Sequence, residues 1–324
     1  MATCARFLII ALASVATICA TAARAEWPTR RINLIVPFAA GGGADPVARQ
    51  IAEEISKRLG QPVTVDFRPG ANGTIGATAA AKARPDGYTF LLTSPAPITN
   101  AKPLNRDLPY DPDRDFDPII HIAEAPLALI TNASIPAGTF GEFVEYAKLH
   151  PGDVTVAISG VGGLGHQAAV LMSYKAGIKV TYVPYNGAGS MMADMIGKHV
   201  NASAGFPAAF IEAVKDGTLR ILTVFADHRV DEIPNVPSIV ESGYPDAQIN
   251  AWYILFAPKG TPEAITAKLG GVVKDYLATD AVKTRFKTLG YDVTGFDARK
   301  STEIIAKDRA SFVELLNLGL MNTP

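Results

Sequence analysis

Cysteine is almost absent from this sequence of 324 residues, and its two cysteines, Cys4 and Cys19, both lie near the N-terminus. They fall in a segment whose apolar stretch, residues 7–22, is followed by a small-x-small cleavage pattern. This arrangement is typical of a secretory signal peptide, so we expect residues 1–25 to be removed. The exported chain would contain no cysteine and no disulfide, and we expect it in the bacterial periplasm.

Long apolar runs and clustered basic residues are also missing. After the first 25 residues, no run approaches the ~20 apolar residues of a membrane-spanning helix. The chain has 30 basic and 31 acidic residues, a formal net charge of −1, and no dense basic run. Nucleic acid and anionic membrane surfaces are therefore poor candidates for partners. The remaining length is sufficient for two domains, and we expect a monomer.

The sequence lacks the motifs of common catalytic and cofactor sites. It has no G-x-x-x-x-G-K-[ST] phosphate-binding loop and no G-x-S-x-G nucleophile elbow. Residues 160–165 match G-x-G-x-x-G, but the acidic residue that a dinucleotide site needs is absent from residues 182–186. The histidines are scattered without metal-ligand spacing, at His121, His150, His166, His199 and His228. We expect no enzyme, cofactor or metal site, although a hydrolase without these motifs stays open as an alternative.

The sequence does have a regular alternation of apolar, β-rich runs and helical patterns. Strands are predicted over residues 32–38, 63–67, 88–93, 127–131, 154–158, 180–185, 200–204 and 219–225. Helices are predicted over residues 45–59, 74–83, 262–277 and 301–318, and near residues 190–197. One more helix is predicted to begin at residue 139 with a capping box, and another to follow residues 159–166 and to end at about residue 176. The proline- and aspartate-rich residues 103–119 are expected to form a surface connection. These repeats favour an α/β fold with mostly parallel sheets flanked by helices.

Two glycine-rich loops stand between a predicted strand and a predicted helix. The first lies in VPFAAGGGAD, residues 36–45, and the second is SGVGGLGH, residues 159–166. A helix N-terminus presents unpaired N–H groups and the positive end of the helix dipole, and glycine lets an anion approach the backbone. Ligands of open α/β sheets bind beyond the carboxyl ends of the strands, so two facing domains would place both loops in one cleft. The sequence thus predicts reversible binding of a carboxylate.

Short motifs along nearly the whole exported chain resemble the Bug family of periplasmic solute-binding proteins, the receptors of tripartite tricarboxylate transporters. The matching pieces are WPTRRINLIVPFAAGGGAD, RPGANGTIGA, PDGYTFLL, LPYDPDRDFDPI, SGVGGLGH, VPYNG, IPNVPSIVESG and APKGTP. The resemblance implies a two-domain Venus flytrap, with residues 26–125 plus 252–324 in domain 1 and residues 126–251 in domain 2. It also implies capture of a small carboxylate and a partner in the membrane subunits of the transporter.

The resemblance places ligand-binding residues in both loops and beside them. These are Phe38, Ala39, Ala40, Gly43, Asp45, Ser94, Pro95, Ser159, Gly160, Gly163, His166, Tyr185, Asn186, Gly205 and Phe206. Three of them have a structural alternative. Asp45 has the residue type of a helix N-cap, His166 falls in the first turn of a predicted helix, and Tyr185 is a large aromatic residue of a predicted strand, a type that often packs in the core.

Departures from the family pattern make the expected cleft less polar. Ala44 stands where the family usually has Thr, Ser or Asn, and Val161 and Leu164 stand where polar residues are common. Gly205 and Phe206 align with a stretch that often carries an acid able to meet a ligand amine. We therefore expect a carboxylate with an apolar or aromatic body rather than an amino acid. A receptor that feeds a signalling partner stays open as an alternative to transport.

Overall fold

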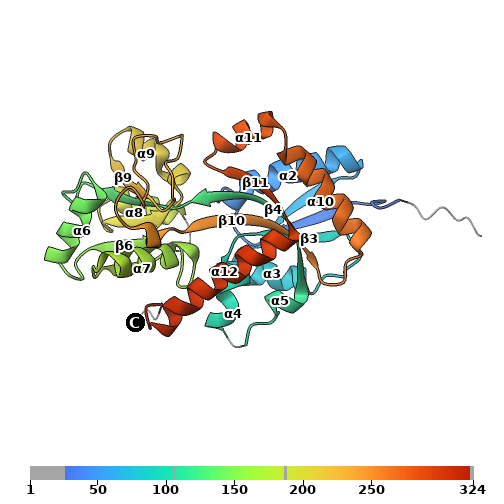
Figure 1. Cartoon of the computed structure of the whole chain (residues 1–324), viewed down its shortest axis with the longest axis horizontal. Helices are drawn as coiled ribbons and strands as arrows, with labels where there is room; N and C mark the ends of the chain where they lie inside the picture. Colours follow the sequence, from blue (N-terminus) through green and yellow to red (C-terminus); the bar gives the residue numbers. More distant parts are fainter. Residues whose placement is uncertain (1–25, 106, 186–187, 322–324) are drawn as a thin grey trace, which may run out of the picture.

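The structure is a computed structural model that describes residues 26–105, 107–185 and 188–321. Figure 1 shows two α/β domains side by side, with long strands running between them. The two-domain α/β fold expected from the sequence is confirmed. The predicted signal peptide and Asn186 lie outside the described residues.

The first domain is built on a six-stranded sheet. Its strands are β1 (Ile32–Val36), β2 (Val63–Phe67), β3 (Thr89–Thr93), β4 (Phe116–Pro126), β10 (Asn250–Pro258) and β11 (Asp292–Asp297). The spatial order is β11-β4-β10-β3-β1-β2. β1 runs parallel to β2 and β3, whereas β10 is antiparallel to β3 and β4, and β11 is antiparallel to β4.

The second domain is built on a five-stranded sheet. Its strands are β5 (Ala128–Asn132), β6 (Thr155–Ile158), β7 (Thr181–Pro184), β8 (Ala202–Gly205) and β9 (Leu219–Val224). The spatial order is β7-β6-β8-β5-β9. β6 is parallel to β7 and β8, and β5 is antiparallel to β8 and β9. Both sheets are therefore mixed rather than mostly parallel.

Helices cover both faces of each sheet. In the first domain they are α2 (Ala44–Leu59), α3 (Thr74–Ala81), α4 (Ala101–Leu104), α5 (Pro112–Asp115), α10 (Glu263–Leu277), α11 (Asp280–Lys287) and α12 (Ala298–Asn317), with the short helical turns η1 (Ala71–Gly73) and η2 (Ala96–Asn100). In the second they are α6 (Phe140–Leu149), α7 (Leu164–Ala176), α8 (Ala188–Ile196) and α9 (Ile211–Lys215), with η3 (Pro207–Phe210) and η4 (Pro245–Ala247).

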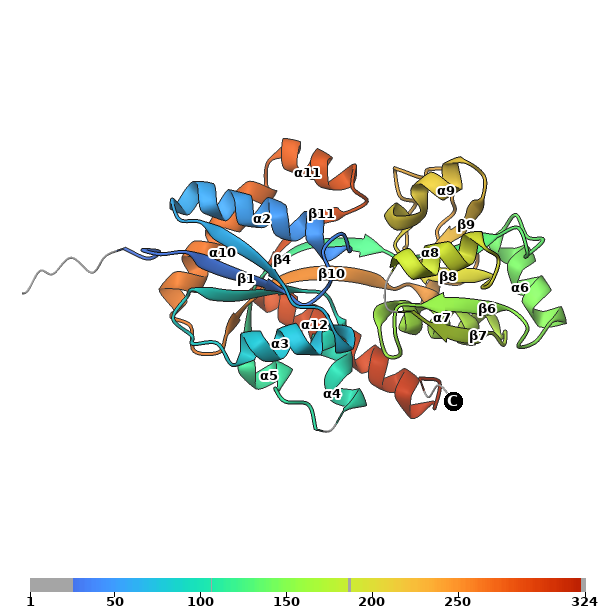
Figure 2. The same cartoon turned by 180° about the vertical axis from the view of Figure 1, so that it is seen from behind.

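The alternation of side chains along β1 explains how the first sheet holds two helical layers. Ile32 and Leu34 point into the cluster that contains the apolar face of α2 and α10, while Ile35 points into the cluster that contains α3 and α12. In Figure 2, α2 lies above the sheet and α3 lies below it. The apolar face predicted for α2 is confirmed, since Val47 and Ile51 are fully buried.

The antiparallel strands come from the segments that connect the two domains. β4 pairs with β10 along nearly its whole length and leads directly into β5. The end of α12 also reaches the second domain, where Phe312 and Leu315 pack with Val170 and Leu171 of α7. The domain boundaries at residues 126 and 252 stay a prediction, because the C-terminal helix contacts both domains.

Two sequence-based assignments are corrected. Residues 103–119 are not wholly a surface connection, because they include α5 and the start of β4. β4 was not predicted because Asp117 and Pro118 interrupt its apolar pattern, and the strand is formed by long-range pairing with β10. Helix α2 begins at Ala44 with Gly43 as its N-cap, so Asp45 lies in the first turn.

The capping box at the start of α6 is confirmed, since Thr139 Oγ1 accepts a hydrogen bond from the Glu142 N–H.

Candidate functional site: two glycine loops at the domain interface

The first glycine loop connects β1 to α2 and is organised by Asp45. The Asp45 carboxylate is buried at 9% exposure, and its Oδ2 accepts a hydrogen bond from the Gly41 N–H at 2.7 Å. Gly41 has a φ of +79°, a conformation that favours glycine. Arg49 Nε donates to Asp45 Oδ1 at 2.5 Å. Asp45, predicted as a ligand contact, thus uses its oxygens within the loop in this structure.

The loop keeps backbone N–H groups available at its exposed side. Ala39 and Ala40 are exposed, and Phe38 is half-buried against Gly73. Among the described residues, the N–H groups of Ala39, Ala40 and Gly43 have no hydrogen-bond acceptor. Such N–H groups at the start of a 16-residue helix can hold an anion without a cationic side chain.

Gly43 lies where the two domains meet. A Cβ on Gly43 would lie 2.6 Å from the Tyr253 hydroxyl and 3.4 Å from the Phe206 ring. Tyr291 donates its hydroxyl hydrogen to the Gly43 carbonyl at 2.7 Å. Phe206 belongs to the second domain, so the absence of a side chain at Gly43 allows close contact between the domains. The structure therefore brings together two residues, Gly43 and Phe206, that the sequence placed in one site.

The second glycine loop connects β6 to α7, and much of it is satisfied internally. The Gly160 N–H donates to the Ile158 carbonyl at 2.9 Å, and the Gly163 N–H donates to the Gly160 carbonyl at 3.2 Å. Gly160 has a φ of +83° and Gly162 a φ of +76°. Ser159 is exposed at the beginning of the loop. The N–H groups of the two predicted contacts, Gly160 and Gly163, thus close the loop itself.

His166 is fully buried and supports this loop from inside. Its Nδ1 accepts a hydrogen bond from the Gly162 N–H at 3.1 Å, which places the ring proton on Nε2. Burial lowers the pKa of His166 to about 4, so the imidazole is neutral near pH 7. The ring meets Tyr182 edge-on with centroids 5.2 Å apart. His166 therefore positions the loop backbone in this structure rather than lining an open surface.

Two asparagines of the first domain reach across to the second loop. Asn72 Nδ2 donates to the Val161 carbonyl at 2.6 Å, and Asn100 Nδ2 donates to the Gly162 carbonyl at 3.1 Å. Asn100 also donates to Gln167 Oε1 at 3.3 Å. These contacts place the second loop, like Gly43 of the first, at the interface between the domains.

The remaining predicted residues flank the two loops. Pro95 is buried just before η2, and its carbonyl accepts hydrogen bonds from the N–H and hydroxyl groups of Thr99. Ser94 is half-buried beside it. Gly205 ends β8, and a Cβ there would lie 3.1 Å from Phe210. These positions belong to strand ends near the interface, as ligand-bearing positions of α/β sheets do.

Tyr185 follows β7 and is tied to its own domain. Its hydroxyl donates to Asp194 Oδ2 at 2.7 Å. Burial, together with the neighbouring Asp194 carboxylate, raises the pKa of Tyr185 to about 12. The hydroxyl therefore stays protonated near pH 7 and bonded to α8.

Sequence reasoning missed the bridging residues Asn72 and Asn100. The motif around Asn72 predicted a turn but no contact with the second domain. In the structure, Ala71 and Asn72 both have left-handed φ values, +46° and +50°. Non-glycine residues adopt this region rarely and often at functional sites. Tyr253 and Tyr291, which contact Gly43, come from β10 and from just before β11, more than 200 residues further along the chain.

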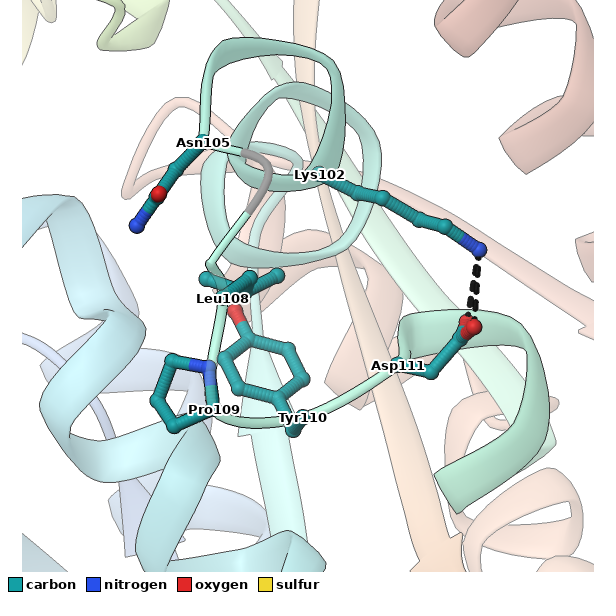
Figure 3. Close-up of a pocket in the computed structure, with 6 residues that line it drawn as sticks. All are labelled: Lys102, Asn105, Leu108, Pro109, Tyr110 and Asp111. Atoms are coloured by element: carbon teal, nitrogen blue, oxygen red, sulfur yellow. Dashed lines mark hydrogen bonds and ion pairs between the residues drawn. The ribbon is translucent and has the colours of Figure 1, made fainter.

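Another hollow lies away from the two loops, on the outer surface of the first domain. It has a volume of about 550 Å³ and is lined by Lys102, Asn105, Leu108, Pro109, Tyr110 and Asp111. In Figure 3 the Lys102 side chain extends to Asp111, with its Nζ 2.8 Å from Asp111 Oδ2. Tyr110 donates its hydroxyl hydrogen to the Pro97 carbonyl. The charges of this hollow are paired with each other, and the second domain contributes none of its lining.

The described residues also limit the kinds of site present. Within the described ranges, no group of three or more His, Cys, Asp or Glu side chains is placed to hold a metal ion. No helix in this part of the chain has the length and apolar character needed to cross a bilayer.

The fold and the paired loops define a two-domain solute-binding protein. Residues 47–317 match the family described as the tripartite tricarboxylate transporter family receptor. The chain therefore belongs to this family, which includes the Bug proteins, as the sequence motifs predicted.

Three relatives give the comparison detail. The chain is 34% identical to protein BugT of Bordetella pertussis over 265 residues, which cover 82% of this chain and 81% of BugT. It resembles the structure of Rpa4515 of R. palustris with adipate, with a TM-score of 0.84, 31% identity, and coverage of 90% of this chain and 98% of that one. It also resembles MatC of Rhodopseudomonas palustris with bound malate, with a TM-score of 0.80, 31% identity, and coverage of 91% and 100%.

Proposed function

We propose that this chain is a periplasmic receptor that captures a small carboxylate between its domains and delivers it to the membrane subunits of a tripartite transporter. One observation carries the proposal: α2 and α7 both begin at the domain interface behind glycine loops. The first loop has N–H groups without acceptors among the described residues. The adipate- and malate-bound relatives support a carboxylate as the ligand class.

Binding would work by closure of the two domains around the ligand. The carboxylate would accept hydrogen bonds from the first loop, where the α2 dipole adds favourable electrostatics. The contacts from Asn72 to Val161 and from Asn100 to Gly162 can form only when the domains approach each other. The segments near residues 126 and 252 would act as hinges, and the closed form would dock on the transporter. The residues need no cofactor for this role, and no chemical step is involved.

Thermal unfolding of the chain from Glu26 onward tests the binding step. The panel contains aliphatic dicarboxylates, amino acids, and benzoate- and phthalate-type acids. A ligand that binds only the folded state stabilises it by about 2.7 kcal/mol at 100 times its Kd. We expect one class of acid to raise the melting temperature and to be recovered unchanged. No shift with any acid, in protein shown by mass spectrometry to be ligand-free, would refute the proposal.

Uptake measurements test the transport step. A host strain that takes up the identified acid through this system should lose uptake when the receptor gene is deleted. Uptake should return when the chain is supplied again. Unchanged uptake after deletion, with binding intact, would assign the receptor to a signalling partner instead.

A further inference from the structure

A second, smaller pocket lies between the two domains, beside the first glycine loop. Its volume is about 160 Å³. The first domain contributes residues near the β4–β5 connection and the turn before β11, and the second contributes the η3–α9 region and the loop after β9. Most of the lining is apolar, including Phe206, Ala208, Ile211, Ile233 and Leu289.

The pocket adjoins the carboxylate-binding loop through two shared residues. Phe206 lines the pocket, and its ring lies 3.4 Å from the position of a Cβ on Gly43. Tyr291 also lines the pocket and donates its hydroxyl hydrogen to the Gly43 carbonyl. A ligand whose carboxylate lies at the first loop would therefore have the pocket as the neighbouring space for its other end.

The lining disfavours a second negative charge. Glu232 is the one charged residue among the described residues of the lining. Burial raises the pKa of Glu232, and Asp231 and Asp292 raise it further, whereas a backbone hydrogen bond and the nearby Lys287 lower it. The described lining contains no Lys, Arg or His, so a second carboxylate placed here would lose water without a basic side chain of the pocket to pair with. An uncharged group avoids this cost.

We propose that this pocket takes the apolar end of the ligand, and that the preferred ligand is a monocarboxylic acid carrying one aromatic ring. The inference rests on the proposed carboxylate-binding function and specifies its substrate class. The size is suitable, because an apolar cavity of about 150 Å³ accommodates benzene in another protein. The dicarboxylates held by the relatives would gain little from such a pocket.

Calorimetric titration of the chain from Glu26 onward tests the pocket. The probes are three matched pairs: phenylacetate and acetate, 3-phenylpropionate and propionate, and 4-phenylbutyrate and butyrate, with adipate as a separate dicarboxylate. We expect at least one phenyl acid to bind about tenfold or more tightly than its ring-free partner, because the ring leaves water on binding.

Substitutions in the lining test whether the extra affinity of the phenyl acids comes from this pocket. Ala208→Trp places a large side chain in the pocket, and should weaken binding of the phenyl acid by about tenfold or more, a larger loss than it causes for the ring-free partner acid. Leu289→Asn makes the lining more polar and should weaken it several-fold. Leu318→Asn is the matched control, since Leu318 is also an exposed leucine but lies outside the lining. Ala208 and Leu289 are exposed, so both variants should fold, which the melting temperature checks.

The outcomes separate this inference from the proposed function. If acids bind but the ring adds no affinity, or if Ala208→Trp leaves the ring's contribution intact, the pocket assignment is wrong and the receptor function stands. If adipate and every other carboxylate fail to bind the ligand-free protein, the receptor function itself is wrong.

Discussion

Asn72 of the first domain donates a hydrogen bond to the Val161 carbonyl of the second, with 2.6 Å between the two heavy atoms. Asn72 makes this contact from a left-handed backbone conformation, with a φ of +50°. Strain of this kind persists where the surroundings hold it in place. The contact joins the tip of the second glycine loop to the other domain, so it should help to hold the two domains together.

Replacing this asparagine should loosen the closed state. Asn72→Ala removes a hydrogen bond with a net contribution of about 1 kcal/mol, so affinity for the carboxylate should fall about fivefold, mainly through faster dissociation. Asn105→Ala is the control, because within the described residues the Asn105 side chain bonds to the nearby Asp107 N–H and to no residue of the second domain. Stopped-flow measurement of ligand release checks both variants. Equal release rates for Asn72→Ala and the unmodified chain would show that the contact does not hold the domains together.

The Asp45 carboxylate should control the shape of the first loop. Asp45→Ala removes the acceptor of the Gly41 N–H and should lower the free energy of unfolding by about 2 kcal/mol and ligand affinity by more than tenfold. Asp45→Asn keeps an acceptor oxygen and should retain most of the affinity. Arg49→Gln removes the ion pair of an exposed arginine and its contact with the face of the Phe67 ring, and should have little effect. Denaturant unfolding and titration provide the two readouts, and equal losses in the Ala and Asn variants would contradict this role.

The sequence predicted the elements whose signals are local. The strand, glycine loop and helix around residues 32–59 are recognisable from a short apolar run, three glycines and a helical apolar face, and the structure confirms them with the start of α2 moved to Ala44. β4 and β10 were missed because they are stabilised by pairing with each other across more than 100 residues of sequence.

The same difference between local patterns and long-range contacts applies to the candidate site. The two glycine loops could be identified because a strand, a run of glycines and a helix start are visible in the sequence, whereas Ala39, Ala40 and Gly43 were assigned through the resemblance to the Bug family. The contacts of Tyr291 with Gly43 and of Asn100 with Gly162 could not be identified in this way, since each joins residues far apart in the chain. Their positions follow from the packing of domains and strands, which a local pattern does not encode.

Acid should destabilise the protein partly through His166. Burial holds the pKa of the folded-state imidazole at about 4, below its usual value near 6.5. Between these values the unfolded chain binds the proton and the folded chain does not, so the contribution of His166 to the free energy of unfolding falls as pH drops from about 7 to 4 and is constant above that range. The loss from His166 should reach about 3 kcal/mol.

A histidine variant separates this contribution from those of other groups. His121 is also buried with a pKa lowered to about 4, so it contributes a slope of the same sign. His166→Gln should therefore reduce the fall in stability between pH 7 and pH 4 without abolishing it. Denaturant melts at a series of pH values give the comparison. A variant with the same pH dependence as the unmodified chain would place the acid sensitivity elsewhere.

The lack of a side chain at Gly43 should be required for closure rather than for backbone conformation. Gly43 has a φ of −59°, which alanine adopts freely, but an added Cβ would lie 2.6 Å from the Tyr253 hydroxyl and 3.4 Å from the Phe206 ring. Tyr253 is fully buried and cannot move without disturbing the core. Gly43→Ala should therefore cost about 1–3 kcal/mol in stability and weaken ligand binding at least tenfold.

Gly271→Ala provides the matched control for that substitution. Gly271 lies inside α10, and a Cβ there would have no heavy atom within 4 Å. Alanine is the better helix former by about 0.5–1 kcal/mol, so Gly271→Ala should raise the melting temperature and leave affinity unchanged. Thermal melts with and without the bound acid measure both effects. If Gly43→Ala binds the acid as tightly as Gly271→Ala, the close approach of Phe206 to Gly43 is not needed for binding, because the domains can close around a larger residue.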